Sequence, residues 1–235
     1  MSGPVRLEDG AVQVSVQGVS LALRPSGAVW LAAHQTLVVA DLHLEKGSAY
    51  AARGQMLPPY DTRETLSRLG REVAALAPRR VIFLGDTLHD RRAEARIAPE
   101  DAQAVSALAA GLDLVWVVGN HDADGPVKLP GRCVQTVGLE ALILRHEPQS
   151  GAQPGEVAGH LPPCAQVKGR GRSVRRRCFA TDGTRLVLPA FGAYAGGLNL
   201  KDAAFKPLFA KPPLAGVLGK DQVHLIAWNQ LLSDG

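Results

Sequence analysis

The sequence predicts an α/β fold of two β-sheets with helices packed outside, in a single domain over residues 1–235. Apolar runs typical of buried strands alternate with helical patterns up to residue 118, which indicates a mostly parallel sheet with right-handed crossovers. Later apolar runs are joined by short loops with no convincing helical pattern between them, which indicates a second sheet. The hydrophobic content of 46% in 235 residues is enough for a sizeable core.

Strand patterns mark the first half of the chain. Residues 12–16 alternate apolar and polar side chains, as a half-buried strand does, and residues 19–23 continue this pattern as a hairpin. The runs at 36–41, 81–85 and 114–118 are instead rich in apolar residues throughout, which is typical of strands buried on both faces. We expect these three runs to be the parallel strands of the first sheet.

Two helices are predicted between these strands. Asp61 and Glu64 fit a capping box, and apolar residues then recur every three or four positions, which predicts an amphipathic helix over 61–77. A second helix is predicted over 99–111, because it begins with proline and has acidic residues in its first turn. The segment 45–59 has no clear period and is predicted to form a loop.

The second half of the chain is predicted to consist of strands. Apolar runs at 141–146, 156–159, 177–181 and 185–188 are separated by short loops, and a Thr-Asp-Gly-Thr sequence between the last two favours a hairpin turn. The segment 217–227 has a Gly-Lys-Asp turn between two apolar runs and predicts a final hairpin.

Composition limits the environment and the partners of this chain. A formal net charge of +4 allows an anionic partner without requiring one. The three cysteines are an odd number with no Cys-x-x-Cys spacing, which favours a reducing compartment over a disulfide framework. No apolar run approaches the roughly 18 residues of a membrane span, and residues 1–6 contain no apolar signal core. We therefore expect a cytoplasmic protein with no membrane partner.

Side chains able to bind a metal ion follow the predicted strands, at the point where each strand ends. Because open α/β sheets place their ligand sites at the C-terminal ends of the strands, these side chains are expected to meet at one edge. Any one of them alone would more often be a cap, turn or core residue, but chance seldom places so many at strand ends. The candidate ligands are Asp41, His43, Asp86, Asn120, His146 and His160.

The chemistry of these donors favours an open catalytic site. All are oxygen or imidazole donors and none is a thiolate, which argues against a closed structural zinc site and suits Mn²⁺, Fe or Zn²⁺. The set exceeds what one catalytic ion needs, so it predicts two ions about 3.5–4 Å apart that share one carboxylate. Asp86, central in the order, is the expected bridge. Such a pair of ions binds both the attacking and the leaving oxygen when one displaces the other in line at phosphorus.

At these positions the chain resembles the calcineurin-like metallophosphoesterases, from about residue 37 to residue 162. The matching motifs are Asp41-Leu42-His43, Gly85-Asp86, Gly119-Asn120-His121-Asp122, His146 and Gly159-His160. The strings 85–90, 146–148 and 188–199 resemble, more narrowly, the bacterial branch called ligase-associated DNA damage response endonucleases, or PdeM. The resemblance implies a calcineurin-like αββα sandwich, in which two mixed β-sheets are flanked by helices.

The resemblance also divides the ligands between two divalent ions, expected to be Mn²⁺, with Fe or Zn²⁺ as alternatives. By this resemblance the first ion is held by Asp41 and His43, the second by Asn120, His146 and His160, and both by the bridging Asp86.

Two neighbouring residues are given catalytic roles by the same resemblance. His121 would face the phosphate and stabilise or protonate the leaving oxygen, a role that suits an imidazole. Asp122 would orient His121. Hydrolysis would proceed through a metal-activated hydroxide.

One motif departs from the family pattern. The family ends its metal motifs with Gly-His-x-His, and here the last position is Pro162, which has no donor atom. We expect the first site to keep Asp41, His43 and Asp86 and to bind its ion more weakly. Cys164 lies close in sequence and is an alternative ligand, although a free cysteine is more often buried and inert.

A basic run follows the last metal motif by a few residues. Residues 168–177 contain six cations interleaved with glycines. We interpret this run as a flexible arm that neutralises phosphates; the alternative is a solvated loop between strands. No aromatic residues are interleaved, so a base-stacking surface is not indicated. The substrate-binding candidates are Arg170, Arg172, Arg175, Arg176 and Arg177.

The remaining histidines carry weaker signals. His34 and His224 lie in strand-like runs and are expected to be structural. His89 lies in the loop after Asp86. The sequence is equally consistent with a His89 that contacts the substrate or a metal ligand and with a His89 that is only a loop residue.

The resemblance implies a metal-dependent phosphodiesterase, a nuclease acting on DNA in repair, with a DNA ligase and a helicase as expected partners. A phosphodiesterase of small nucleotides is an alternative, and steep salt dependence of binding would favour DNA. A second alternative, suggested by Pro162, is a non-catalytic or one-metal nucleic-acid-binding module.

Overall fold

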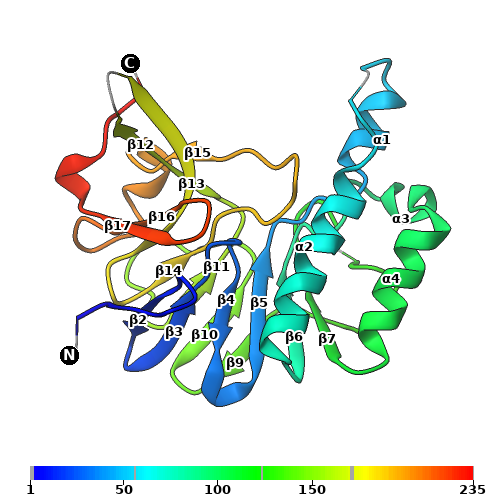
Figure 1. Cartoon of the computed structure of the whole chain (residues 1–235), viewed down its shortest axis with the longest axis horizontal. Helices are drawn as coiled ribbons and strands as arrows, with labels where there is room; N and C mark the ends of the chain where they lie inside the picture. The colour runs from blue at the N-terminus through cyan, green and yellow to red at the C-terminus, as the bar shows by residue number, and fades with distance from the viewer. Residues whose placement is uncertain (1–2, 56, 123, 170–171, 235) are drawn as a thin grey trace.

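The fold is described by a computed structural model that covers residues 3–55, 57–122, 124–169 and 172–234. Two mixed β-sheets pack face to face (Figure 1). Among the described residues, the largest apolar cluster draws side chains from both sheets and lies between them. The two-sheet α/β sandwich expected from the sequence is confirmed. Among the described residues, no helix is both long and apolar enough to cross a membrane.

The first sheet has eight strands in sequence order, from β1 to β8. Neighbouring strands from β1 to β5 pair antiparallel, and neighbouring strands from β5 to β8 pair parallel. The bounds are β1 (Val5–Arg6), β2 (Val12–Val16), β3 (Val19–Leu23), β4 (Val29–Leu31), β5 (Thr36–Ala40), β6 (Arg80–Leu84), β7 (Asp113–Val117) and β8 (Arg132–Val134).

The second sheet has the order β15-β12-β13-β14-β11-β10-β9, with β16 beside β13 and β17 beside β16. It is mixed, because β10, β11 and β14 are parallel neighbours while β12, β13 and β16 are antiparallel. The bounds are β9 (Val137–Leu139), β10 (Leu142–Arg145), β11 (Glu156–Ala158), β12 (Pro163–Lys168), β13 (Ser173–Thr181), β14 (Leu186–Val187), β15 (Leu198–Asn199), β16 (Leu214–Leu218) and β17 (Val223–Ile226).

Helices cover the outer face of the first sheet, at the right of Figure 1. These helices are α1 (Lys46–Ala51), α2 (Asp61–Leu76), α3 (Ala93–Arg96) and α4 (Pro99–Ala109). Short 3₁₀ turns occur elsewhere in the chain as η1 (Ala32–His34), η2 (Ala203–Phe205) and η3 (Trp228–Gln230). The outer face of the second sheet is covered by η2 and the chain around it, where Phe205 and Leu208 pack beside Cys178.

The strand β6 shows why the central runs are apolar throughout. Ile82 and Leu84 belong to the cluster between the sheets, whereas Val81 and Phe83 pack beneath the helices. The ring of Phe83 stacks on Trp116 of β7 at a centroid distance of 4.0 Å. A strand in this middle layer is buried on both faces, so neither face needs polar residues.

Three local predictions are wrong. The segment 45–59 contains the helix α1. The helix α2 begins at Asp61 after Tyr60, and no side-chain cap is formed, so the predicted capping box is absent. An Asp61 carboxylate oxygen instead accepts from the backbone amide of Gly47 at 3.1 Å, which fastens α1 to α2.

The third error concerns the basic run. The sequence predicts a flexible arm, with the next strand starting at residue 177. The described residues instead form a hairpin, because β13 begins at Ser173 and pairs antiparallel with β12 from Lys168↔Ser173 to Cys164↔Arg177.

Candidate metal centre

Strand pairing brings the predicted ligands together. In the first sheet Ala40, Leu84 and Val117 are the last residues of β5, β6 and β7, and the parallel register aligns the strand ends. In the second sheet Arg145 and Ala158 end β10 and β11 side by side. The residues that follow each strand therefore meet at one edge, where the two sheets adjoin.

The backbone at this edge is in a conformation that most residues avoid. Asp41, His43, Asp86 and His160 have positive φ values of 51°, 47°, 45° and 64°. This left-handed region costs free energy for residues other than glycine and occurs at functional sites that the surrounding structure holds in place. Here the His43 amide donates to the Asp86 carbonyl at 2.8 Å, which fixes the two loops against each other.

Two buried carboxylates lie at the centre of the site. Asp41 and Asp86 are only 1% and 3% exposed. The Asp41 oxygens accept from the His160 amide at 3.1 and 3.0 Å, and the Asp86 Oδ1 accepts from the His121 amide at 3.0 Å. Burial raises the pKa of Asp41 well above its ordinary value, and the charge of Asp86 raises it further. A cation bound between these carboxylates would offset the burial of their charge.

A cluster of three donors lies on one side of Asp86. Its Oδ1 lies 3.4 Å from His146 Nε2, which is 2.9 Å from Asn120 Oδ1 and 3.1 Å from His160 Nδ1. The other ring nitrogen of His146 lies 3.1 Å from the Leu84 carbonyl oxygen. With the proton on Nδ1, where it would be donated to this carbonyl, Nε2 would offer its lone pair to a metal ion in the site. Burial lowers the pKa of His146, which favours the neutral ring that a metal ion binds.

A second cluster lies on the other side of the same carboxylate. Ligand atoms of Asp41, His43 and Asp86 all lie within 4.8 Å of one another. Burial lowers the pKa of His43 to about 4, although Asp86 opposes this shift. The buried Nδ1 of His43 has no hydrogen-bond partner among the described residues. A neutral imidazole, an orphaned ring nitrogen and two buried carboxylates fit a divalent cation.

Pro162, at the sequence position of the missing ligand, takes part in backbone hydrogen bonding beside β12. The Pro162 carbonyl accepts from the Leu198 amide at 2.9 Å, at the start of β12. Cys164 is buried within the β12 pairing, and no cluster of metal-binding side chains in the described parts of the chain includes it. The alternative of a cysteine ligand therefore gains no support.

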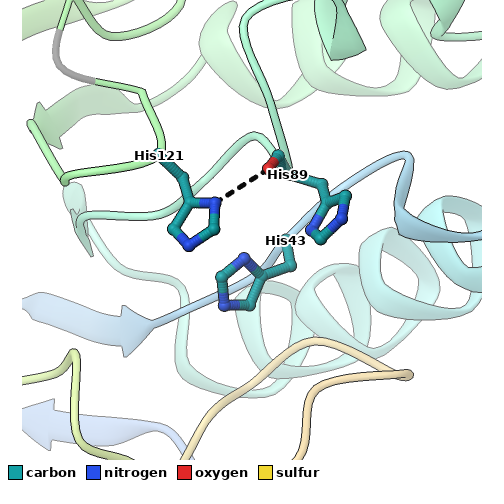
Figure 2. Close-up of side chains that lie close together, drawn as sticks. All are labelled: His43, His89 and His121. Carbon is teal, nitrogen blue, oxygen red and sulfur yellow. Dashed lines mark hydrogen bonds between the residues drawn. The ribbon is translucent and has the colours of Figure 1, made fainter. Parts of the chain in front are cut away.

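Three histidines form a further cluster that the sequence pattern does not resolve (Figure 2). The rings of His43, His89 and His121 have centroid distances of 5.3–5.9 Å. His121 Nδ1 lies 3.0 Å from the His89 carbonyl oxygen, and His121 Nε2 lies 3.9 Å from Asp86 Oδ2. His89 thus lies beside the site, and its place three residues after Asp86 was the only sequence signal for this.

Asp122 has a different contact from the one expected. Its carboxylate accepts from the backbone amides of Gly119 at 3.0 Å and Leu88 at 3.1 Å. The group that positions the ring of His121 is the His89 carbonyl. Asp122 therefore fastens the β7 loop to the β6 loop, and it supports His121 only through that loop. Burial raises the pKa of Asp122 to about 6.

The basic candidates that the structure describes make no hydrogen bond or ion pair with a candidate ligand, since their partners lie elsewhere. Arg172, Arg175 and Arg176 are exposed on the β12–β13 hairpin, and Arg170 lies outside the described residues. Arg177 is half-buried, and its guanidinium donates to the carbonyls of Ala190, Ala193 and Ala195 at 2.7–3.1 Å. This arginine holds the 190–195 segment in place.

Comparisons with known proteins identify the family of this chain. The family model described as calcineurin-like phosphoesterase matches residues 34–192. The crystal structure of Pseudomonas putida nuclease MPE is similar, with a TM-score of 0.71 and 29% sequence identity over 92% of this chain and 100% of that chain. No curated protein matches the chain significantly.

Two more distant structures are also similar in part. YfcE, a phosphoesterase from E. coli, has a TM-score of 0.37 and 17% identity over 84% of this chain and 96% of that chain. The protein of unknown function AQ665 from Aquifex aeolicus has a TM-score of 0.36 and 12% identity over 57% of this chain and 80% of that chain. The family match spans well over half of the sequence and contains every candidate ligand. The chain therefore belongs to the calcineurin-like phosphoesterase family.

Proposed function

We propose that this protein is a metal-dependent phosphodiesterase that acts as a nuclease on DNA. The observation that carries the proposal is the position of Asp86 between two donor clusters. Its Oδ1 lies 3.4 Å from His146 Nε2, and its Oδ2 lies 4.0 Å from His43 Nε2. A carboxylate placed in this way suits a bridge between two ions. The similarity to a nuclease at 29% identity supports the choice of substrate.

Asp41 and His43 would hold the first ion and Asn120, His146 and His160 the second, with Asp86 between them. Two divalent ions bound there, expected to be Mn²⁺, would polarise the phosphate and lower the pKa of a water molecule. The chain itself supplies the geometry. Its buried carboxylates and neutral imidazoles are fixed by backbone hydrogen bonds before any substrate arrives.

His121 is placed to act on the leaving group. Its Nδ1 is held by the His89 carbonyl, so its Nε2 is directed toward the Asp86 side of the site. The side chain is 43% exposed and so is open to a substrate. In its protonated form the ring would keep the contact with His89 and give the Nε2 proton to the departing oxygen.

The biological setting is proposed from the resemblance to the ligase-associated branch. The protein would act in DNA repair in the cytoplasm, beside a DNA ligase and a helicase. The strings at 85–90, 146–148 and 188–199 support this setting.

Hydrolysis of bis-p-nitrophenyl phosphate with Mn²⁺ tests the catalytic proposal. The natural protein is expected to turn over, and Asp86→Asn to be inactive. The control variant Asp113→Asn, at the opposite end of the first sheet, is expected to keep its activity. Pro162→His should lower the Mn²⁺ concentration needed for half-maximal rate, because it adds an imidazole near the first site.

A non-catalytic nucleic-acid-binding module is the second candidate, because Pro162 removes a family ligand. An inert natural protein that gains activity in Pro162→His would favour it. A phosphodiesterase of small nucleotides would instead hydrolyse a cyclic nucleotide faster than a DNA oligonucleotide.

A further inference from the structure

A groove of about 700 Å³ lies between α2 and the strands β13 and β16. Six of its eight charged side chains are cationic, and the other two are Glu64 and Glu72. They come from three separate parts of the chain, so the groove exists only in the folded protein. The cations are Arg68, Arg71, Arg175, Arg176, Arg177 and Lys220.

The two acidic side chains do not neutralise the groove. Glu72 is buried and forms a 2.5 Å ion pair with Arg24, which lies outside the groove lining and also pairs with Asp9. Glu64 lies 4.0 Å from Arg71. Among the described residues, Arg68, Arg176, Arg177 and Lys220 have no carboxylate partner within ion-pair distance. The groove therefore keeps an excess of positive charge.

Holding the charged side chain of Arg68 in the groove costs free energy, because the side chain is partly removed from water. One of its terminal nitrogens donates to the Phe191 carbonyl at 2.5 Å, and its guanidinium lies 4.7 Å from the centre of the Phe191 ring. Its buried Nε has no hydrogen-bond partner in the described chain. Burial lowers the pKa of Arg68, and the neighbouring Arg177 lowers it further. Two like charges held together in this way favour the arrival of an anion.

The segment 190–195 joins this groove to the metal centre. On one side, the amides of Phe191 and Gly192 donate to the carbonyls of Ala40 and Asp41 at 2.7 and 3.2 Å. On the other side, the carbonyls of the same segment accept from Arg68 and Arg177. The groove thus begins a few residues from the metal ligand Asp41.

We propose that this groove binds the phosphate backbone of a nucleic-acid strand whose reactive phosphodiester lies at the metal centre. The inference rests on the proposed nuclease function and adds Arg68, Arg71 and Lys220 to the residues that contact DNA. A strand carries one negative charge about every 3.4 Å along its axis, so several successive phosphates can meet a row of cations. The described lining contains no aromatic side chain, which predicts binding to phosphates rather than to bases.

Charge reversal tests the groove without disturbing its structural arginines. Arg71, Arg176 and Lys220 are exposed, whereas Arg68 and Arg177 hold the 190–195 segment. The variant is Arg71→Glu with Arg176→Glu and Lys220→Glu. The matched control is Arg79→Glu with Lys128→Glu and Lys211→Glu, which changes the net charge equally at exposed positions outside the groove.

Binding is measured by fluorescence anisotropy of a labelled single-stranded oligonucleotide in EDTA, which prevents hydrolysis. The groove variant is expected to bind at least tenfold more weakly than the natural protein, and its slope of log Kd against log salt should fall by about two. The control variant should keep most of the natural affinity, and both variants should keep the natural Tm. A labelled duplex measured in parallel distinguishes the preferred strand form.

Equal affinities of the groove and control variants would overturn the proposal, and so would a natural protein that binds neither oligonucleotide. Because binding is measured without metal, the result does not depend on catalysis. A protein that binds through the groove but hydrolyses no diester would refute the nuclease function alone. If the natural protein hydrolyses the diester but the groove variant binds DNA as tightly as the natural protein does, only the groove proposal is refuted.

Discussion

The backbone amide of His160 donates to both carboxylate oxygens of Asp41, at 3.0 and 3.1 Å, although the residues are 119 positions apart. Asp41 follows β5 of the first sheet, and His160 follows β11 of the second. This contact therefore fastens the two sheets together at the edge where the ligands gather. The candidate metal centre is thus part of the packing between the sheets, so a metal ion bound there should stabilise the whole fold.

Mn²⁺ is accordingly expected to raise the Tm of the natural protein. At about 100 times its Kd, a ligand adds about 2.7 kcal/mol to the free energy of unfolding. For a chain of this size that corresponds to a rise of roughly 5–10 °C. Asp86→Asn should lose most of the rise, and Asp113→Asn should keep it. Differential scanning calorimetry with and without EDTA measures both, and an equal rise in Asp86→Asn would contradict the assignment of the bridge.

Gly85→Ala should damage the second metal site. A Cβ at this position would lie 2.3 Å from the ring atoms of His146, and the φ of +66° is strained for alanine. We expect the variant to fold and to bind fewer Mn²⁺ ions per chain, measured by elemental analysis after gel filtration. Gly70→Ala is the matched control, because nothing lies within 4 Å of its added Cβ in α2. It should bind metal normally and gain up to about 1 kcal/mol of stability. Full metal content in Gly85→Ala would contradict this account.

The gathering of the candidate ligands could be predicted from the sequence because each follows an apolar run, and neighbouring parallel strands end at one edge. The contacts that organise the loops could not. Asp61 matches a capping box, but its carboxylate binds the Gly47 amide of a helix that has no sequence period. Asp122 matches an orienting role, but its partners are backbone amides of two loops. These contacts depend on how the loops pack, which short-range patterns do not encode.

The basic run shows the same limit. Its glycines favour a flexible arm, yet the pairing of Val167 with Val174 and Gln166 with Arg175 makes a hairpin. The groove that its arginines share with α2 brings together residues more than 100 positions apart. No local pattern predicts such a surface, because its parts meet only when the sheets pack.

The turn after β13 is expected to lose stability in acid. Burial opposes ionisation of Asp182, but hydrogen bonds from Thr184 and from the Arg185 amide outweigh it and lower the pKa below the ordinary value of 3.8. A lowered pKa stabilises the fold above about pH 4, and this contribution disappears as the pH falls through the folded-state pKa. The difference in unfolding free energy between the natural protein and Asp182→Asn should therefore be constant near neutrality and shrink below about pH 4. Urea unfolding at several pH values measures it, and a constant difference down to about pH 3 would exclude this role for the carboxylate.

His121→Ala should slow the reaction most where the leaving group is basic. His121 Nε2 is directed toward the Asp86 side of the site, while Nδ1 is held by the His89 carbonyl. A departing DNA oxygen needs a proton, whereas p-nitrophenolate leaves readily without one, and a general acid contributes about 10²–10⁴-fold. The variant should therefore lose about that factor in kcat on an oligonucleotide and much less on bis-p-nitrophenyl phosphate. Equal losses on both substrates would show that His121 stabilises the charge of the phosphate instead of protonating the leaving oxygen. Elemental analysis of the variant, expected to match the natural protein, separates either outcome from a loss of metal.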